Sequence, residues 1–254
     1  MKFPPKQIGV SQTPQGHRKA TPCGVCYNGP MAIRKTSFAI NEWYHCYNRG
    51  VDKRITYEDA HDYHRFLEQL YLANSEIALR RDDISTQNFE KILQVPRNGA
   101  LVSIGAFCLM PNHFHLVLKE IVENGITIFM QKLGTAYTMY FNGRYTRTGN
   151  LFIKPFRSRH VGNDNYLQHL INYVHCNPAE LYEPRWKIGH IKNVRALTEK
   201  LIEYSYSSLS AYENVRLPTR AILGEDIFDV ARITPAGQMI REAKEYYSEN
   251  PELL

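Results

Sequence analysis

The stretch Phe-Cys-Leu-Met-Pro-Asn-His-Phe-His-Leu-Val-Leu, residues 107–118, decides how this chain folds and where its chemistry lies. The apolar residues on either side of the Pro-Asn dipeptide predict two strands, over 100–110 and 113–119, joined by a turn. Side chains at positions i and i+2 of a strand point to the same face of the sheet. His113 and His115 therefore share one face, where two imidazoles can form half of a metal site.

The remaining periodic segments predict an α+β protein. Apolar residues at helical spacing alternate along the chain with strand-like segments rich in aromatic residues. This order predicts an antiparallel sheet with helices packed on one face, interrupted by a charged and polar excursion over 74–98. The further elements expected are helices over about 59–73, 125–141 and 164–176 and strands over 37–49 and within 151–161.

The composition limits the class of protein. A length of 254 residues suits one domain with extensions, or one and a half domains. A net charge of +6 and 17 tyrosines favour a polyanionic partner whose bases can stack on aromatic rings. No stretch approaches the roughly 18–20 apolar residues of a membrane span, and no secretory signal is recognisable. Five cysteines do not suggest a disulfide framework, so a cytoplasmic protein is expected.

The domain organisation is expected to have three parts. Residues 1–30 contain basic residues, prolines and no acidic residue, and are predicted to be a disordered arm or sequence added by an upstream start codon. Residues 31–182 are expected to form the catalytic domain and residues 183–254 a helical C-terminal extension. The pair Cys23 and Cys26 in the arm lacks two further ligands nearby for a zinc site, since only one histidine is close.

The third predicted helix carries a second pair of chemically interesting side chains. Tyr173 and Asn177 are four residues apart, so they lie on one flank of the helix beside its apolar stripe. Pro178 follows Asn177 and disfavours helical geometry there, so Asn177 is expected at the helix end with its side chain free to leave the helix line. An Asn-Pro pair is also an ordinary stop signal, and a tyrosine on such a flank is often a core residue.

Combined, the two pairs predict a catalytic site for phosphodiester chemistry. His113, His115 and Asn177 would supply three ligands to a divalent cation, Mg²⁺ or Mn²⁺. Tyr173 would attack the polarised phosphorus as a covalent nucleophile and give a 5′-phosphotyrosine and a free 3′-OH. A free tyrosine, with a pKa of about 10, is a weak nucleophile at neutral pH. Polarisation of the phosphodiester by the metal makes a strong nucleophile less necessary. The alternative is that the two histidines only pack.

A basic segment over 144–160 supports a nucleic-acid substrate, because it contains no acidic residue and interleaves cations with aromatic side chains. A solvated basic hairpin is the alternative interpretation. Arg49, at the end of the first strand, is a further candidate for phosphate binding. The predicted DNA-binding residues are Arg49, Arg144, Arg147, Lys154, Arg157 and Arg159.

At these residues the chain resembles the HUH transposases of the IS200-like, single-tyrosine type, and more narrowly the REP-associated tyrosine transposases. The matching segments run in family order over about residues 37–182. They are Tyr44 to Gly50, Phe107 to Leu118, Gly149 to Phe152 and Tyr173 to Pro178.

The resemblance implies a ferredoxin-like fold and cleavage and rejoining of single-stranded DNA, often at hairpin-bearing ends. The family's paired histidines correspond to His113 and His115, its nucleophile to Tyr173 and its third, polar ligand to Asn177. Relatives of the insertion-sequence type act as dimers and REP-associated relatives can act as monomers, so a monomer or homodimer is expected.

Two other functions are also compatible with these sequence features. A replication or conjugation initiator would use the same chemistry, but the short chain shows no helicase motif. A non-catalytic, ferredoxin-like nucleic-acid-binding regulator would bind DNA without forming a covalent adduct.

Overall fold

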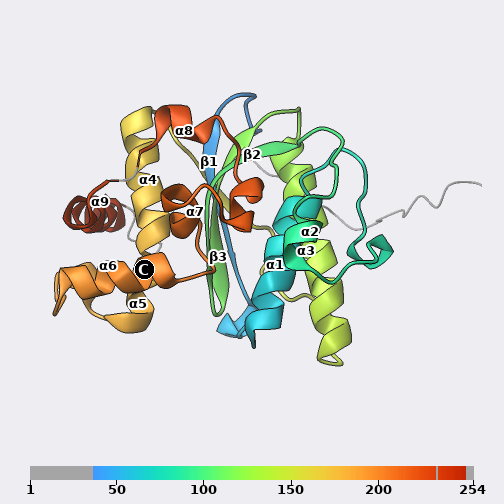
Figure 1. Cartoon of the computed structure of the whole chain (residues 1–254), viewed down its shortest axis with the longest axis horizontal. Coiled ribbons are helices and arrows are strands. Elements are labelled where there is room, and N and C mark those ends of the chain that lie inside the picture. Colours follow the sequence, from blue (N-terminus) through green and yellow to red (C-terminus); the bar gives the residue numbers. More distant parts are fainter. Residues whose placement is uncertain (1–36, 233, 250–254) are drawn as a thin grey trace, which may run out of the picture. The chain divides into compact units, whose positions relative to one another are not determined.

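The computed structural model describes residues 37–232 and 234–249, which belong to one compact unit (Figure 1). The arm expected over 1–30, with its cysteine pair, lies outside the described residues. No helix in the described part of the chain is long and apolar enough to cross a membrane. The cytoplasmic location remains a prediction.

A four-stranded antiparallel sheet forms the centre of this unit. Its spatial order is β2-β3-β1-β4, and every neighbouring pair is antiparallel. Because helices α1 and α3 connect β1 to β2 and β3 to β4, this order is that of a ferredoxin-like fold, and the predicted α+β class is confirmed. The strands are β1 (Trp43–Arg49), β2 (Val102–Met110), β3 (His113–Glu120) and β4 (Arg157–His160).

Helices account for most of the remaining described structure. The α-helices are α1 (Ala60–Leu72), α2 (Phe89–Ile92), α3 (Gly125–Arg144), α4 (Asp164–Cys176), α5 (Ala179–Tyr182), α6 (Val194–Glu203), α7 (Leu209–Glu213), α8 (Ile227–Val230) and α9 (Ala236–Glu249). Short 3-10 turns are η1 (Val51–Lys53), η2 (Arg81–Asp83), η3 (Trp186–Ile188) and η4 (Pro218–Ile222).

Helices cover both faces of the sheet, rather than the one face expected from the sequence. The rings of Phe114 on β3 and Phe66 on α1 lie 5.1 Å apart, on the face that α1 and α3 cover. The neighbouring residue His115 faces the other way, and its ring lies 5.3 Å from Tyr173 on α4. Figure 1 shows α1 and α3 on one side of the strands and α4 on the other. Alternation along β3 thus separates a face that is apolar except for Glu120 at its end from a face that carries both histidines.

Local sequence explains where α4 begins and how it is rotated. The side chain of Asn163 accepts a hydrogen bond from the backbone N–H of Tyr166 and caps the first turn. The stripe predicted to face the core is fully buried, and consists of Leu167, Leu170, Ile171 and Val174. Each such side chain contributes about 1.5–3 kcal/mol on burial. The stripe therefore sets the rotation that turns Tyr173 toward β3.

Two of the remaining predicted segments differ from the structure, and one is confirmed. The first strand begins at Trp43, because Asn41 adopts a positive φ of 65° in a turn. The short strand expected within 151–161 is confirmed as β4, which begins after Pro155, a residue with no N–H to donate, while Phe152 forms an isolated bridge with Gly50. The excursion over 74–98 contains η2 and α2.

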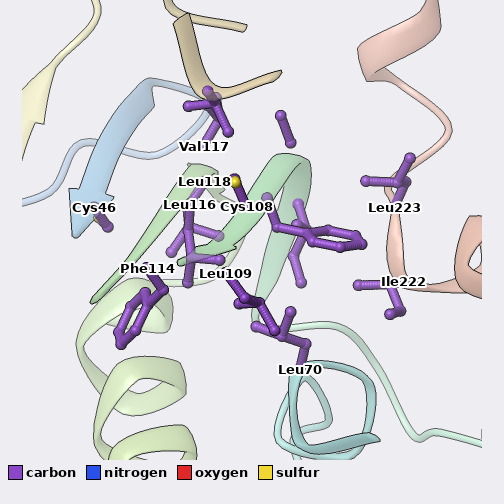
Figure 2. Packing of buried hydrophobic residues seen from close by; sticks show 14 of the residues in the cluster. Cys46, Leu70, Cys108, Leu109, Phe114, Leu116, Val117, Leu118, Ile222 and Leu223 are labelled. Carbon is purple, nitrogen blue, oxygen red and sulfur yellow. The ribbon is translucent and has the colours of Figure 1, made fainter. Parts of the chain in front are cut away.

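The segment after α6 completes the core and covers the outer edge of β2. The backbone N–H of Leu109 donates to Tyr206 O at 2.9 Å, and Ser208 N–H donates to Phe107 O at 2.9 Å. Figure 2 shows Ile222 and Leu223 of this segment near core residues of β2 and β3. This pairing satisfies backbone groups that an edge strand would otherwise leave open.

Candidate active site

The two central strands bring together the polar residues of one sheet face. Arg49 on β1 lies directly opposite His113 on β3, and Tyr47 lies opposite His115. Since alternate residues share a face, His45 joins the same row on β1. The motif at the end of the first strand and the paired histidines are therefore parts of one site.

His113 and His115 each form a hydrogen bond through Nδ1 of the imidazole ring. His113 Nδ1 lies 2.7 Å from Oδ1 of Asn112, and His115 Nδ1 lies 2.9 Å from Nε2 of His45. An amide oxygen only accepts, so Nδ1 of His113 carries the proton and its Nε2 holds a lone pair. Metal-binding histidines commonly use one ring nitrogen for the metal and donate the other N–H to an acceptor. The hydrogen bond of His113 therefore fits a metal ligand.

Desolvation keeps these rings neutral near pH 7. Burial lowers the pKa of His113 to about 3, with smaller contributions from the charges of Arg49 and Lys187. Burial also lowers the pKa of His45 to about 3, and it holds the pKa of His115 well below its ordinary value of 6.5. Neutral imidazoles are the form that binds a metal ion.

Tyr173 lies against these histidines and is fully buried. Its ring centroid is 5.3 Å from that of His115 and 5.6 Å from that of His45, both edge to face. On its other side the ring of Tyr246 from α9 lies 4.6 Å away. The structure thus places the predicted nucleophile beside His115, one of the predicted metal ligands, and beneath a residue of the C-terminal helix.

Asn177 is located where expected, but its backbone geometry differs from the prediction. It is buried and helical, with φ −53° and ψ −42°, although Pro178 follows it. Its Nδ2 donates to the carbonyl oxygen of Tyr173 at 2.9 Å, which replaces part of the last helical turn. The side chain therefore does not leave the helix line. In this arrangement the amide nitrogen is engaged, and the amide oxygen is the atom suited to a cation.

A cavity of about 330 Å³ opens beside the two histidines. Arginine side chains and a tyrosine ring line it together with the imidazoles, a combination suited to a phosphate and a base. Tyr173 and Asn177 are not among its lining residues. The lining residues are Tyr47, Asn48, Arg49, Asp52, Lys53, His113, His115, Ile153, Pro155 and Arg157.

The predicted DNA-binding cations fall into two groups. Arg49 and Arg157 line the cavity, and Lys154 and Arg159 are exposed close to Arg157 in the chain. Arg144 instead forms ion pairs with Asp59 at 2.6 Å and Asp62 at 2.8 Å.

The acidic partners of Arg144 come from α1 and its N-cap residue. The segment 144–160 contains no acidic residue, so its sequence alone did not predict these ion pairs. The hydrogen bond from Arg144 lowers the pKa of Asp59. The guanidinium of Arg147 donates to the amide oxygen of Asn142.

Among the described residues, no group of three histidine, cysteine, aspartate or glutamate side chains could hold a metal ion. The candidate ligand set does not need such a group, since it combines two imidazoles with the amide of Asn177. That donor set suits Mn²⁺, and Mg²⁺ would retain several waters.

Three residues of this site were not predicted as site residues. His45 and Tyr47 precede Arg49 at spacing i, i+2 and i+4, so strand alternation alone could have placed them beside the histidines. Tyr246 is far along the chain, and no local pattern connects it to Tyr173.

Comparisons with known proteins identify the region that carries the site. The family model described as "Transposase IS200 like" matches residues 73–177. A solved structure described as "Structure of the REP associates tyrosine transposase bound to a REP hairpin" has 12% sequence identity and a TM-score of 0.42, and covers 81% of this chain and 99% of that chain. No curated protein matches the chain. The matched region contains His113, His115, Tyr173 and Asn177, and this region of the chain is similar to the IS200-like transposases.

Proposed function

We propose that this protein is a metal-dependent single-stranded DNA endonuclease and strand transferase, a transposase that cuts through a covalent 5′-phosphotyrosine intermediate. The observation that supports it most is the juxtaposition of Tyr173 with His115, at 5.3 Å between ring centroids, beside a cavity lined by His113, Arg49 and Arg157. A nucleophile, two neutral imidazoles and phosphate-binding cations are what phosphodiester transfer needs.

The cation would be held by Nε2 of His113 and of His115, with Asn177 as the third protein ligand. Asn112 fixes Nε2 of His113 as the free ring nitrogen, because Nδ1 is used in a hydrogen bond of 2.7 Å. A bound Mg²⁺ or Mn²⁺ supplies Lewis-acid polarisation of the phosphodiester and orients it.

Tyr173 would attack phosphorus through its phenolic oxygen. One bond forms between this oxygen and phosphorus, and the bond from phosphorus to the 3′-oxygen breaks. The 3′-oxygen leaves with a proton as a free 3′-OH, and the downstream DNA remains linked to Tyr173 through its 5′-phosphate. Because the energy of the phosphodiester is retained, a 3′-OH can attack in turn and rejoin strands without ATP.

The DNA would enter through the cavity beside the histidines. Arg49 and Arg157 would contact backbone phosphates, and Tyr47 offers a ring for stacking on an unpaired base. Lys154, Arg159 and Arg147 extend the basic surface. We further propose a hairpin-bearing substrate and a monomer or homodimer as the active form.

The non-catalytic DNA-binding regulator remains a second candidate, because one observation favours it. Tyr173 has no exposed surface, and Tyr246 packs on it. A phosphodiester cannot reach a nucleophile in this state, so catalysis requires the packing to open.

Covalent trapping separates the two candidates. The protein is mixed with labelled single-stranded hairpin DNA and Mn²⁺ and analysed on a denaturing gel. The transposase predicts an SDS-stable protein–DNA band that disappears with chelator and in Tyr173→Phe. Tyr137→Phe is a matched control, since Tyr137 is also fully buried but faces the other side of the sheet, where its hydroxyl donates to Thr56 O. Binding without a band across a panel of hairpins would favour the regulator.

A further inference from the structure

His45 is the residue of this site whose chemistry is not yet assigned. It is fully buried on β1, and its Nε2 lies 2.9 Å from Nδ1 of His115. In the sheet register His45 pairs with Val117, two residues beyond His115 on β3, so the two imidazoles are diagonal neighbours on one face. Their rings are nearly parallel, at 21° and 5.1 Å between centroids.

The direction of this hydrogen bond decides whether His115 can bind a metal. Each neutral imidazole has one N–H and one lone pair. If His115 donates from Nδ1, its Nε2 keeps a lone pair that can bind a cation. If His45 donates instead, the proton of His115 is on Nε2 and blocks that ligand.

A third side chain can complete the first direction, because a phenol hydroxyl can accept a hydrogen bond as well as donate one. When Nε2 of His45 accepts, Nδ1 of His45 carries its proton and needs an acceptor. The hydroxyl of Tyr246 on α9 lies 3.4 Å from this Nδ1. With the first direction, the hydrogen bonds form a chain of donors that starts at His115, passes through His45 and ends at the hydroxyl of Tyr246.

We propose that His45 is a positioning residue that holds His115 in the tautomer with a free Nε2, and so prepares it as a metal ligand. This inference rests on the proposed function, because it assigns a role toward the cation proposed there. It parallels the bond from Asn112 to His113, so that both metal ligands are fixed through Nδ1.

If His45 had only a packing role, any aromatic ring of similar size could replace it at position 45. The ring of His45 contacts the rings of Tyr47 at 4.7 Å and Tyr173 at 5.6 Å, and a phenyl ring would satisfy these contacts equally. Only the positioning role needs an acceptor at the place of Nε2. Glutamine supplies one through its side-chain oxygen, whereas phenylalanine does not.

The test measures Mn²⁺ affinity by calorimetry in the full chain, without DNA. We expect His45→Phe to bind Mn²⁺ about 10- to 100-fold more weakly, the usual cost of losing such a partner, and His45→Gln to recover most of the affinity. Cys46→Ala perturbs the same strand on its opposite face and is the matched control, with unchanged affinity expected. Equal affinity in the wild type and His45→Phe would overturn the proposal.

A second readout does not depend on any variant at position 45. Nitrogen NMR of ¹⁵N-histidine-labelled, metal-free protein reports which ring nitrogen of His115 is protonated, with His115→Gln used for assignment. We expect a proton on Nδ1. A proton on Nε2 would overturn the proposal even if His45→Phe does not fold.

The outcome also separates this inference from the proposed function. A wild-type protein that binds no Mn²⁺ would contradict the proposed metal-dependent function itself. A wild-type protein that binds Mn²⁺ with no effect of His45→Phe would leave that function in place and remove only the role of His45.

Discussion

At the scale of single residues, ion pairs distinguish Arg144 from the other cations proposed to contact DNA. Two carboxylates hold Arg144, and the side chain of one of them, Asp62, is fully buried. We expect Arg144→Ala to lower the free energy of unfolding by about 1–3 kcal/mol, between the values for surface and buried pairs, with little effect on DNA affinity.

Arg157→Ala should behave in the opposite way. It should leave stability nearly unchanged and reduce the slope of log affinity against log salt by about 0.7, the value for one phosphate contact with a single strand. Fluorescence anisotropy with labelled single-stranded DNA at several salt concentrations measures both variants. An equal reduction of the salt-dependence slope in Arg144→Ala would contradict the expected difference between Arg144 and Arg157.

His175 predicts a pH dependence of stability that is independent of the metal. Burial lowers its pKa to about 3, and its Nε2 lies 2.9 Å from Ser208 Oγ. Below the unfolded pKa of about 6.5 the unfolded chain binds a proton here and the folded chain does not. Stability is therefore lost as the pH falls from 6.5 toward 3, by about 1.4 kcal/mol per pH unit, with no effect above 6.5.

Denaturant unfolding at pH 7, 6 and 5 tests this contribution. His175→Gln should keep a hydrogen bond to Ser208 and should show a shallower loss of stability with falling pH than the wild type. Parallel curves for the two proteins would show that His175 does not contribute.

At the scale of elements, the burial of Tyr173 predicts that α9 must loosen when DNA reacts. Tyr246 covers the ring of Tyr173 at 4.6 Å, and both side chains are fully buried. In Tyr173→Phe, which keeps the packing but cannot be cut or linked, single-stranded DNA should accelerate amide exchange in α9. Helix α3, on the other face of the sheet, is the internal control. Unchanged protection of α9 in a DNA complex, with adduct formed by the wild type, would contradict this prediction.

Hydrophobic periodicity correctly predicted the helices that bury an apolar stripe. It did not predict element bounds that depend on turns or on pairing with distant parts of the chain. The helix expected over 164–176 coincides with α4, because its capping residue and its apolar spacing are local signals. The start of the first strand was predicted too early, because the turn at Asn41 delays the strand to Trp43. Propensity alone does not report such backbone constraints.

The sequence predicted only those contacts of the site that lie within one strand or one helix. His113 and His115 lie in one strand, so alternation brought them together. Their contact with Tyr173 required the packing of α4 on β3. The contact of His45 with Tyr246 joins residues 201 positions apart, and no spacing rule reaches that far.

At the scale of the whole molecule, the described residues after Tyr182 (183–232 and 234–249) contribute to the same compact unit as the sheet. They supply hydrogen bonds to several backbone groups of β2. In this set Leu109 N–H donates to Tyr206 O, Ser208 N–H to Phe107 O, the Tyr212 hydroxyl to Gly105 O and Gly224 N–H to Ile104 O. Each buried backbone group left unpaired costs about 1–3 kcal/mol.

We therefore expect a chain that ends at Tyr182 not to fold cooperatively. Loss of these hydrogen bonds and of the buried apolar residues after 183 exceeds the 5–15 kcal/mol or so that stabilises a typical domain. Near-ultraviolet circular dichroism during thermal unfolding, with the full chain as reference, measures this. A sharp transition in the truncated chain would show that 183–254 is dispensable for the fold.

The central claim is that Tyr173 becomes covalently linked to the 5′-phosphate of cleaved DNA. The most direct measurement digests the SDS-stable complex and locates the adduct by tandem mass spectrometry, with DNA labelled at either end. We expect the adduct on Tyr173, carrying the downstream fragment, with a free 3′-OH on the upstream fragment. An adduct on another residue, or a protein linked to the upstream fragment, would contradict the claim.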